Sequence, residues 1–212
     1  TAIVEVQPGA SGTIGTQAVS RAQPDGHTLL FTIDLPLAMA PALFPTPYDP
    51  RKDLAPVAAL GETISMVLAH PSTGIRTVAD LVARAKANPG KLTFASGGNA
   101  SPGHMCMELI KLAAGIDLLH VPYKGGAPAI ADLLGERLSF MPINPVEVLP
   151  HLKAGRLRVL AVGSAKRVPM LPEVPTFIEE GHANFQATVW WGLVAPAGTP
   201  REIVTKLNAE AN

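Results

Sequence analysis

The feature that most constrains the fold of this chain is a strand, a glycine turn and a helix that follow one another within Leu92–Leu112. Leu92–Ala95 is a short apolar run with β propensity, and Ser96-Gly97-Gly98-Asn99 interrupts it. Ser101 suits the N-cap of the following helix, and Pro102 suits its first position, where the missing N–H costs nothing. This order predicts a βα unit with a glycine-rich turn.

The helical part of this stretch carries Met105, Leu109 and Leu112 at spacings of four and three, so we expect these residues to form its buried face. The turn before it leaves several backbone N–H groups near a helix N-terminus, and that geometry can hold an anion. An ordinary tight βα turn without a ligand explains the same residues. The stretch alone does not decide between these two readings.

The same plan is repeated immediately downstream. Leu118–Tyr123 reads as a strand, Lys124-Gly125-Gly126 as a turn and Ala127–Leu134 as a helix. Further strands are expected at Ile3–Gln7, Thr28–Ile33, Leu54–Leu60, Ile64–Ala69, Arg137–Ile143, Leu157–Val162 and Ala187–Ala195, and further helices at Thr16–Ala22, Leu37–Phe44, Thr77–Asn88, Val146–Ala154 and Arg201–Ala211. This alternation predicts an α/β fold with mostly parallel sheets and helices on both faces.

The number of strands exceeds one comfortable sheet for 212 residues, so we expect two lobes. Met66–Ala69 and Val189–Ala195 are the segments expected to cross between them. Seventeen basic residues balance seventeen acidic ones without a basic block, which argues against nucleic-acid binding. The longest apolar runs are far shorter than the roughly 20 residues of a membrane span. Cys106 is the only cysteine and falls within a helical run, so a packed, inert thiol is expected.

No catalytic constellation is visible. The chain has no GxSxG elbow, no HExxH motif and no P-loop, because the lysine of Lys124-Gly125-Gly126 precedes its glycines. No two histidines are four residues apart, so we expect no metal site and no cofactor. His104 is the histidine of interest, since it falls in the first helical turn after the first glycine loop, close to an anion held there. His120 lies inside a strand and is expected to be packed.

The remaining candidates bind without reacting. Neutral donors and turn glycines follow the strands: Ser96, Gly97, Gly98, Asn99, Ser101, Tyr123, Gly125 and Gly126. Such groups at strand ends suit a small carboxylate. Lys124 adds a charge if it faces the ligand, although a surface lysine is the commoner outcome. Asp34 stands at the end of another strand, where α/β sheets place ligand groups, and an N-cap for the next helix is the alternative.

Several collinear segments resemble one family. They are PGASGTIG, PDGHTLLF, YDPRKDLAPV, KANPGKLTFASGGN, HVPYKGGAPA, LKAGRLRVLAVGSAKR, LPEVPTF and WWGLVAPAGTP. Together they are similar to the solute-binding proteins of tripartite tricarboxylate transporters, also called the Bug family. The resemblance runs along essentially the whole chain, and the combination of HVPYKG, LRVLAV and APAGTP is specific.

This resemblance implies a two-lobed, type II-like periplasmic binding protein. Such a protein closes an interlobe cleft on a small carboxylate (a di- or tricarboxylate, an amino acid or an aromatic carboxylate) and serves membrane permease subunits. It implies a periplasmic monomer without catalytic residues, although no signal peptide is visible in this chain. An enzyme of similar architecture acting through His104, a solute-sensor component and a structural module without a ligand are the alternatives.

By position, the resemblance implies ligand-binding roles for two sets of residues. In the second lobe they are Ser96, Gly97, Asn99, Ser101, His104, Tyr123, Lys124, Gly125, Gly126 and Ala127, and in the first lobe Thr32 and Asp34. Gly98 and Asn144 are also expected to bind the ligand. The expected lobes are 1–65, then 66–193 with crossing strands at both ends, then 194–212 returning to the first. Family members carry a further strand before Thr1 and continue past Asn212, so we expect the first lobe to be incomplete here.

Asp34 departs from the family pattern, in which a small or neutral residue is usual. If Asp34 lines the cleft, it should repel a second ligand carboxylate and favour a ligand with an amino group or another donor.

Overall fold

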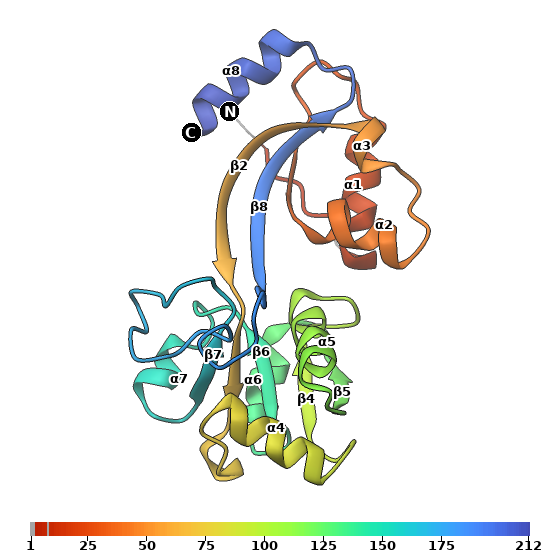
Figure 1. Cartoon of the computed structure of the whole chain (residues 1–212). Helices are drawn as coiled ribbons and strands as arrows, with labels where there is room; N and C mark the ends of the chain where they lie inside the picture. Colours follow the sequence, from red (N-terminus) through yellow and green to blue (C-terminus); the bar gives the residue numbers. More distant parts are fainter. Residues whose placement is uncertain (1–2, 8) are drawn as a thin grey trace. The chain divides into compact units, whose positions relative to one another are not determined.

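The computed structural model describes residues 3–7 and 9–212. The chain divides into two compact units, a first unit of Thr1–Glu62 with Val189–Asn212 and a second unit of Thr63–Thr188. The boundaries fall within β2 (Leu54–Ile64) and at the start of β8 (Thr188–Pro196). Figure 1 labels both strands. Met66–Ala69, expected to cross between lobes, instead forms β3 inside the second unit.

The second unit is built on a five-stranded sheet with the order β5-β4-β6-β3-β7. Its strands are β3, β4 (Thr93–Ser96), β5 (Leu119–Pro122), β6 (Phe140–Ile143) and β7 (Arg158–Val162). Strand β4 runs parallel to β5 and β6, whereas β3 runs antiparallel to both β6 and β7. Four strands therefore share one direction and only β3 is reversed, which confirms a mostly parallel sheet.

Helices cover both faces of this sheet because its strands bury side chains on both sides. In β3, Val67 and Ala69 belong to one buried cluster, and Met66 and Leu68 belong to the other. The first cluster includes side chains of α4 (Val78–Ala87) and α5 (Pro102–Ala114), and the second includes side chains of α6 (Gly126–Leu134). The short helices η3 (Pro71–Thr73) and α7 (Leu149–Lys153) complete the unit.

The buried face of α5 differs from the expected one. Cys106, Met107 and Ile110 are buried against the sheet, whereas Leu112 is 82% exposed and Leu109 is also exposed. The expected stripe and the observed one have the same helical spacing and lie side by side on the helix, so periodicity alone could not choose between them. The expectation was wrong by about one residue in phase.

The ends of the second-unit helices follow from their sequence. Thr77 caps α4, and its side chain accepts the Asp80 N–H while the Asp80 carboxylate accepts the Thr77 N–H, which forms a capping box. Ser101 caps α5 by accepting the His104 N–H, with Pro102 at the first helical position, as predicted. These caps fix where each helix begins relative to the strand before it.

The first unit contains a three-stranded sheet with the order β1-β8-β2, in which β1 (Leu30–Ile33) runs antiparallel to β8. Its helices are η1 (Ala10–Gly12), α1 (Thr13–Ser20), η2 (Leu35–Met39), α2 (Ala40–Leu43), α3 (Pro50–Asp53) and α8 (Arg201–Ala211). A hydrogen bond connects helix α8 to β2: the side-chain amide of Asn208 donates to the Val57 carbonyl at 2.7 Å.

The core of the first unit is small. Its buried cluster consists of Val19, Leu54 and Val194, with two partly buried leucines against it, and Tyr48 and Val57 are buried outside this cluster. The strand expected at Ile3–Gln7 is absent from the described structure: these residues are irregular, and Ile3 is 92% exposed. A strand needs a pairing partner, and no described strand pairs with this segment.

Candidate functional site

The loop that follows β4 is organised around the buried hydroxyl of Ser96. The Ser96 side chain is 0% exposed, and its Oγ accepts the Gly98 N–H at 3.2 Å. The same Oγ lies 2.9 Å from the Gly98 carbonyl and 2.7 Å from Nε2 of His120 on β5. Gly98 has a φ of 133°, which favours glycine. Ser96 therefore holds the loop from the inside rather than facing a ligand.

Two stacked histidines hold the other side of the loop. The rings of His104 on α5 and His120 are 3.9 Å apart with an interplanar angle of 8°, and the Phe94 ring lies 4.8 Å from His120. The Ala100 N–H donates to His104 Nδ1 at 2.9 Å, which holds Ala100 at a φ of 59°. Because Nδ1 accepts, the neutral His104 ring carries its proton on Nε2.

The surroundings of both rings favour the neutral form. Burial lowers the pKa of His104, and Lys111 lowers it further, whereas Glu108, with Oε1 at 3.7 Å from Nε2, acts in the opposite direction. Burial also lowers the pKa of His120, and the neighbouring His104 adds to this effect. A neutral His104 can keep accepting the Ala100 N–H, so the loop geometry depends on the charge state of this ring.

This internal bonding corrects the expected anion cradle. The Gly98 N–H, expected to face a ligand, is instead bonded to Ser96, and the N–H of the neighbouring Ala100 is bonded to His104. Gly97 and Asn99 are exposed, and their N–H groups donate to no acceptor in the described chain. Among the backbone N–H groups of Gly97, Gly98, Asn99 and Ala100, those of Gly97 and Asn99 therefore remain free.

A hydrogen-bonded serine and histidine also raise the question of nucleophilic catalysis. Ser96 is fully buried and shares its hydroxyl with both backbone groups of Gly98, so a substrate cannot reach it. In the described chain no carboxylate or carbonyl hydrogen-bonds to the other ring nitrogen of His120, and such a partner orients the base in a catalytic triad. The hydrogen bond between Ser96 and His120 is therefore structural rather than catalytic.

The second glycine loop lies against the first. The Gly125 N–H donates to the Gly97 carbonyl at 3.3 Å. The Tyr123 hydroxyl donates to Asp132 Oδ2 at 2.6 Å, and Arg137 Nη1 lies 2.6 Å from the other oxygen of Asp132. The single hydroxyl proton of Tyr123 is therefore already used, so only its oxygen lone pairs remain for a ligand.

The rest of this loop opens helix α6. Lys124 and Ala127 are both exposed, and Gly126 is the first residue of the helix. Lys124 forms no salt bridge with any residue that the structure describes. It is the one cation among the expected binding residues.

Asn144, at the end of β6, completes the group in the second unit. Its side-chain amide donates to Glu147 Oε1 at 3.0 Å. The other Glu147 oxygen, Oε2, is packed against Gly126, so closely that a Cβ at Gly126 would collide with it. The carboxyl ends of β4, β5 and β6 thus bring their loops together, as expected of parallel strands.

Sequence reasoning missed the Glu147 carboxylate and the contact of His120 with the loop. The spacing of three residues between Asn144 and Glu147 after a strand end is the signal that points to the pair.

Asp34 directly follows β1 in the first unit and is only 8% exposed. Its Oδ1 is buried without a hydrogen-bond partner in the described chain, and burial raises the pKa of its carboxyl. Asp34 occupies the N-cap position of η2, but its side chain makes no capping bond, so the alternative explanation as a cap lacks its hydrogen bond. Thr32, two residues earlier, is half-buried on β1 opposite Gly192 of β8.

The first unit also holds an apolar cavity of about 400 Å³. Side chains of β2 and β8 line it, among them Leu54, Pro56 and Trp190. None of the expected ligand-binding residues belongs to its lining, and it offers no charged group to a carboxylate.

A comparison with known protein families shows which family the chain belongs to. The model of the tripartite tricarboxylate transporter family receptor (TctC) matches residues 1–212. The chain belongs to this family.

Relatives of the TctC receptor family match along nearly the whole chain. Protein BugT of Bordetella pertussis is 37% identical over 99% of this chain and 65% of its own length. The periplasmic binding protein BugD has a TM-score of 0.86 at 35% identity, with 100% of this chain and 71% of that one covered. MatC from Rhodopseudomonas palustris with bound malate has a TM-score of 0.83 at 34% identity, with 96% and 69% covered.

These matches confirm the two-lobed binding-protein fold class, and they are solute-binding proteins rather than enzymes. The chain spans a little under two thirds of the length of the curated relatives that it matches first.

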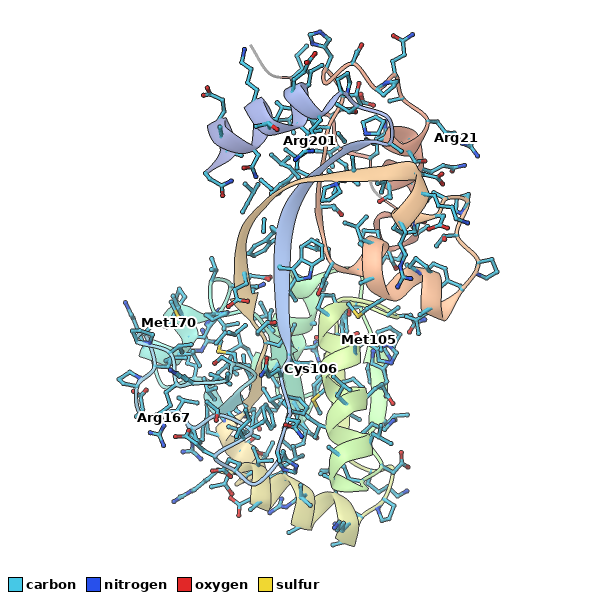
Figure 2. The ribbon with its side chains drawn as sticks, turned by 45° about the horizontal axis from the view of Figure 1, so that its top comes forward. Arg21, Met105, Cys106, Arg167, Met170 and Arg201 are labelled. Atoms are coloured by element: carbon cyan, nitrogen blue, oxygen red, sulfur yellow. The ribbon has the colours of Figure 1, made fainter. Side chains whose placement is uncertain are left out.

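Three further features of this TctC-family chain concern its thiol, its metal-ligating residues and its helices. Cys106 is buried on the sheet side of α5 (Figure 2), and burial raises the pKa of its thiol to about 12, which confirms the packed thiol. Among the described residues, no three His, Cys, Asp or Glu side chains are grouped to hold a metal. Within the same residues no helix combines the length and apolarity of a membrane span.

Proposed function

We propose that this protein is an extracytoplasmic receptor that captures a small carboxylated solute and delivers it to the membrane permease of a tripartite tricarboxylate-type transporter. Membership of the receptor family carries the proposal. The malate bound to the related MatC supports a carboxylate as the ligand class. The periplasmic description of BugD supports an extracytoplasmic location.

The second-unit loops are suited to this task. Gly97 and Asn99 offer exposed neutral donors, Lys124 adds an exposed charge, and the loops are held from behind by Ser96 and His104. Preformed donors on a fixed loop bind a carboxylate without the entropy cost of ordering the loop. In this proposal His104 and His120 hold the loop in place and do not contact the solute.

A thermal-shift screen of di- and tricarboxylates, amino acids and aromatic carboxylates, followed by calorimetry, tests the proposal. A solute at 100 times its Kd stabilises the folded state by about 2.7 kcal/mol, so one class should raise Tm by several degrees. Absence of any shift and of any binding heat across the panel would contradict the proposal.

Asn99→Ala supplies the matched test of the loop. It removes an exposed amide at the carboxyl end of β4, and we expect at least a several-fold loss of affinity for the solute found in the screen. Asn88→Ala removes an exposed amide at the end of α4, on the amino-terminal side of the same strand, and should leave affinity unchanged. Equal effects of the two variants would show that the loop is not the binding element.

A further inference from the structure

The loop between β4 and α5 alternates between backbone groups that side chains hold and backbone groups that stay free. The N–H groups of Gly98 and Ala100 donate to side chains. Those of Gly97 and Asn99 donate to no acceptor in the described chain, and both residues are exposed. The side chains that hold the loop therefore decide how its two free donors are presented.

One pair of stacked rings carries both of the held groups. Ser96 accepts the Gly98 N–H, and its Oγ lies 2.7 Å from Nε2 of His120. The His120 ring stacks on His104 with 3.9 Å between the ring centroids, and His104 Nδ1 accepts the Ala100 N–H at 2.9 Å. Two positions of the loop are thus tied to the same two imidazoles, which we call the His104–His120 stack.

A proton on His104 breaks one of these ties. A neutral imidazole has one acceptor nitrogen, whereas both nitrogens of an imidazolium carry hydrogen. Nδ1 of a protonated His104 would face the Ala100 N–H as donor against donor. Ala100 would then lose the bond that holds it at a φ of 59°, a backbone region that is unfavourable for residues other than glycine. The loop would no longer be held in this conformation.

The surroundings of the stack act on this proton in both directions. Burial lowers the pKa of His104 most, Glu108 raises it with Oε1 at 3.7 Å from Nε2, and Lys111 lowers it. Lys111 is itself bonded to the same Glu108 oxygen at 2.9 Å. Strand β5 contributes His120, whose pKa is also lowered by burial, and β4 contributes Phe94, which does not titrate. A proton on one ring of the stack disfavours a second proton on the other.

We propose that the His104–His120 stack positions the solute-binding loop only while His104 is neutral, so that solute capture is coupled to the release of a proton from this ring to the solvent. This inference rests on the proposed function. The solute binds the held loop better than the released one, and by linkage a bound solute also disfavours protonation of His104. Affinity should be constant above the ordinary pKa of 6.5 and should decline as the pH is lowered through the depressed pKa of His104.

The sign of this pH dependence separates positioning from direct contact. If His104 bound the carboxylate of the solute, its positive charge would attract the anion, and affinity would rise in acid. If His104 positions the loop, the same proton removes the acceptor of the Ala100 N–H, and affinity falls in acid.

Nuclear magnetic resonance of the full chain, labelled with nitrogen-15, tests the first step without a solute. Nδ1 of His104 and the amide of Ala100 should titrate together between pH 8 and pH 5. After correction for intrinsic exchange, the Ala100 amide should exchange with solvent at least about tenfold faster at the acid end. An Ala100 signal that does not move with this ring, or a ring that stays neutral down to pH 5, would overturn the proposal.

Calorimetry over the same pH range tests the coupling, with L-malate, succinate, citrate and L-glutamate as probes. We expect the affinity for any acid that binds at pH 8 to fall at least about fivefold, because a released loop must be ordered again on binding. Buffers of different ionisation enthalpy should reveal the released proton near the midpoint. An affinity that stays constant or rises in acid would overturn the proposal.

Variants assign the effect to the ring and remove the contribution of the titrating solute. His104→Asn places an amide oxygen at the position of Nδ1, since both atoms are bonded to Cγ, so it can accept the Ala100 N–H without titrating. It should bind as the wild type does at pH 8 and lose less affinity in acid. His104→Phe lacks the acceptor and should bind weakly at both ends of the range. His151→Asn, on α7, should keep the wild-type profile.

Glu108→Gln keeps the stack intact and provides the second test. It removes the carboxylate that favours a charged His104, so the midpoint of the decline should move to lower pH. Thermal unfolding at pH 8 checks that each variant is folded. A wild-type pH profile in folded His104→Asn, or an unmoved midpoint in Glu108→Gln, would overturn the assignment of His104.

The outcomes also separate this inference from the proposed function. Binding of a carboxylate with a pH profile that His104→Asn does not change would overturn the inference and leave a carboxylate receptor. Absence of binding by every acid of the panel and of the screen would overturn the proposed function and, with it, the coupling.

Discussion

The two units of this chain differ greatly in the size of their hydrophobic cores. The second unit covers both faces of a five-stranded sheet with helices, and its strands bury side chains on both sides. The first unit has three strands, a hydrophobic cluster of only three buried side chains and an apolar cavity along β2 and β8. The comparison teaches that the second unit is stabilised by its own core, whereas the first has little core of its own.

The largest effect should come from the core of the second unit. Phe140→Ala removes a fully buried ring on β6 that belongs to the same hydrophobic cluster as side chains of α4 and α5. We expect a loss of about 3–5 kcal/mol in the free energy of unfolding of that unit. Val194→Ala in the small core of the first unit should cost only about 1–2 kcal/mol, the transfer free energy of its methyl groups. Urea unfolding with a probe in each unit measures both, and equal losses would break the comparison.

The capping box of α4 should give the next effect. Thr77→Ala removes the side chain that accepts the Asp80 N–H and should destabilise the second unit by about 1 kcal/mol. Thr77→Ser keeps the hydroxyl and serves as the control. A loss as large as that of Phe140→Ala would show that the helix cap, rather than the core, holds the unit together.

Acid should weaken the second unit through its stacked histidines. Burial lowers the pKa of His104 and His120 below the ordinary value of 6.5, so the unfolded chain binds more protons than the folded unit as the pH falls below that value. Their contribution to stability should therefore be complete above about pH 6.5 and decline below it. A protonated His104 also loses the Ala100 N–H bond.

Thermal unfolding between pH 5 and pH 8 measures this decline. His104→Phe keeps an aromatic ring in the stack but cannot titrate, and it should flatten the profile of the second unit. His151→Gln, on α7, should leave the profile unchanged. A profile that is unaffected by His104→Phe would show that the stack does not couple the loop to pH.

The smallest expected effect has the opposite sign and lies in the first unit. Asp34→Asn replaces a buried carboxyl whose Oδ1 has no hydrogen-bond partner in the described chain, and we expect it to raise stability at neutral pH by up to about 1 kcal/mol. Burial raises the pKa of Asp34, so its unfavourable contribution grows as the pH rises through the unfolded pKa of about 4. A marked destabilisation in the variant, measured by urea unfolding at pH 7, would reveal a partner that stabilises the ionised carboxyl.

Much of the second unit could be predicted from the sequence because its elements are short, strongly patterned and bounded by clear signals. Thr77, Ser101 and Pro102 fixed two helix starts correctly. The phase of α5 could not be predicted, since two adjacent stripes were both apolar and only the sheet determines which one is buried. The strand expected at Ile3–Gln7 failed because alternation describes one strand, whereas a sheet requires a second.

The candidate site was predictable in place but not in detail. Strand ends and turn glycines located the loops that contain Gly97 and Gly125, which the structure brings into contact. Which N–H groups remain free depends on side chains far away in the sequence, since His104 and Ser96 take two of them. Such pairings are decided by three-dimensional packing, so no local pattern reveals them.

The burial of Cys106 makes this chain convenient for fluorescent labelling. A single thiol with a pKa of about 12, shielded inside the sheet–helix interface, will not react with a maleimide dye while the protein is folded. A cysteine introduced at an exposed position outside the expected binding residues, such as Val146→Cys in the segment after β6, would then be the one site that takes up dye. A sensor of solute capture can therefore be built without first removing a native cysteine.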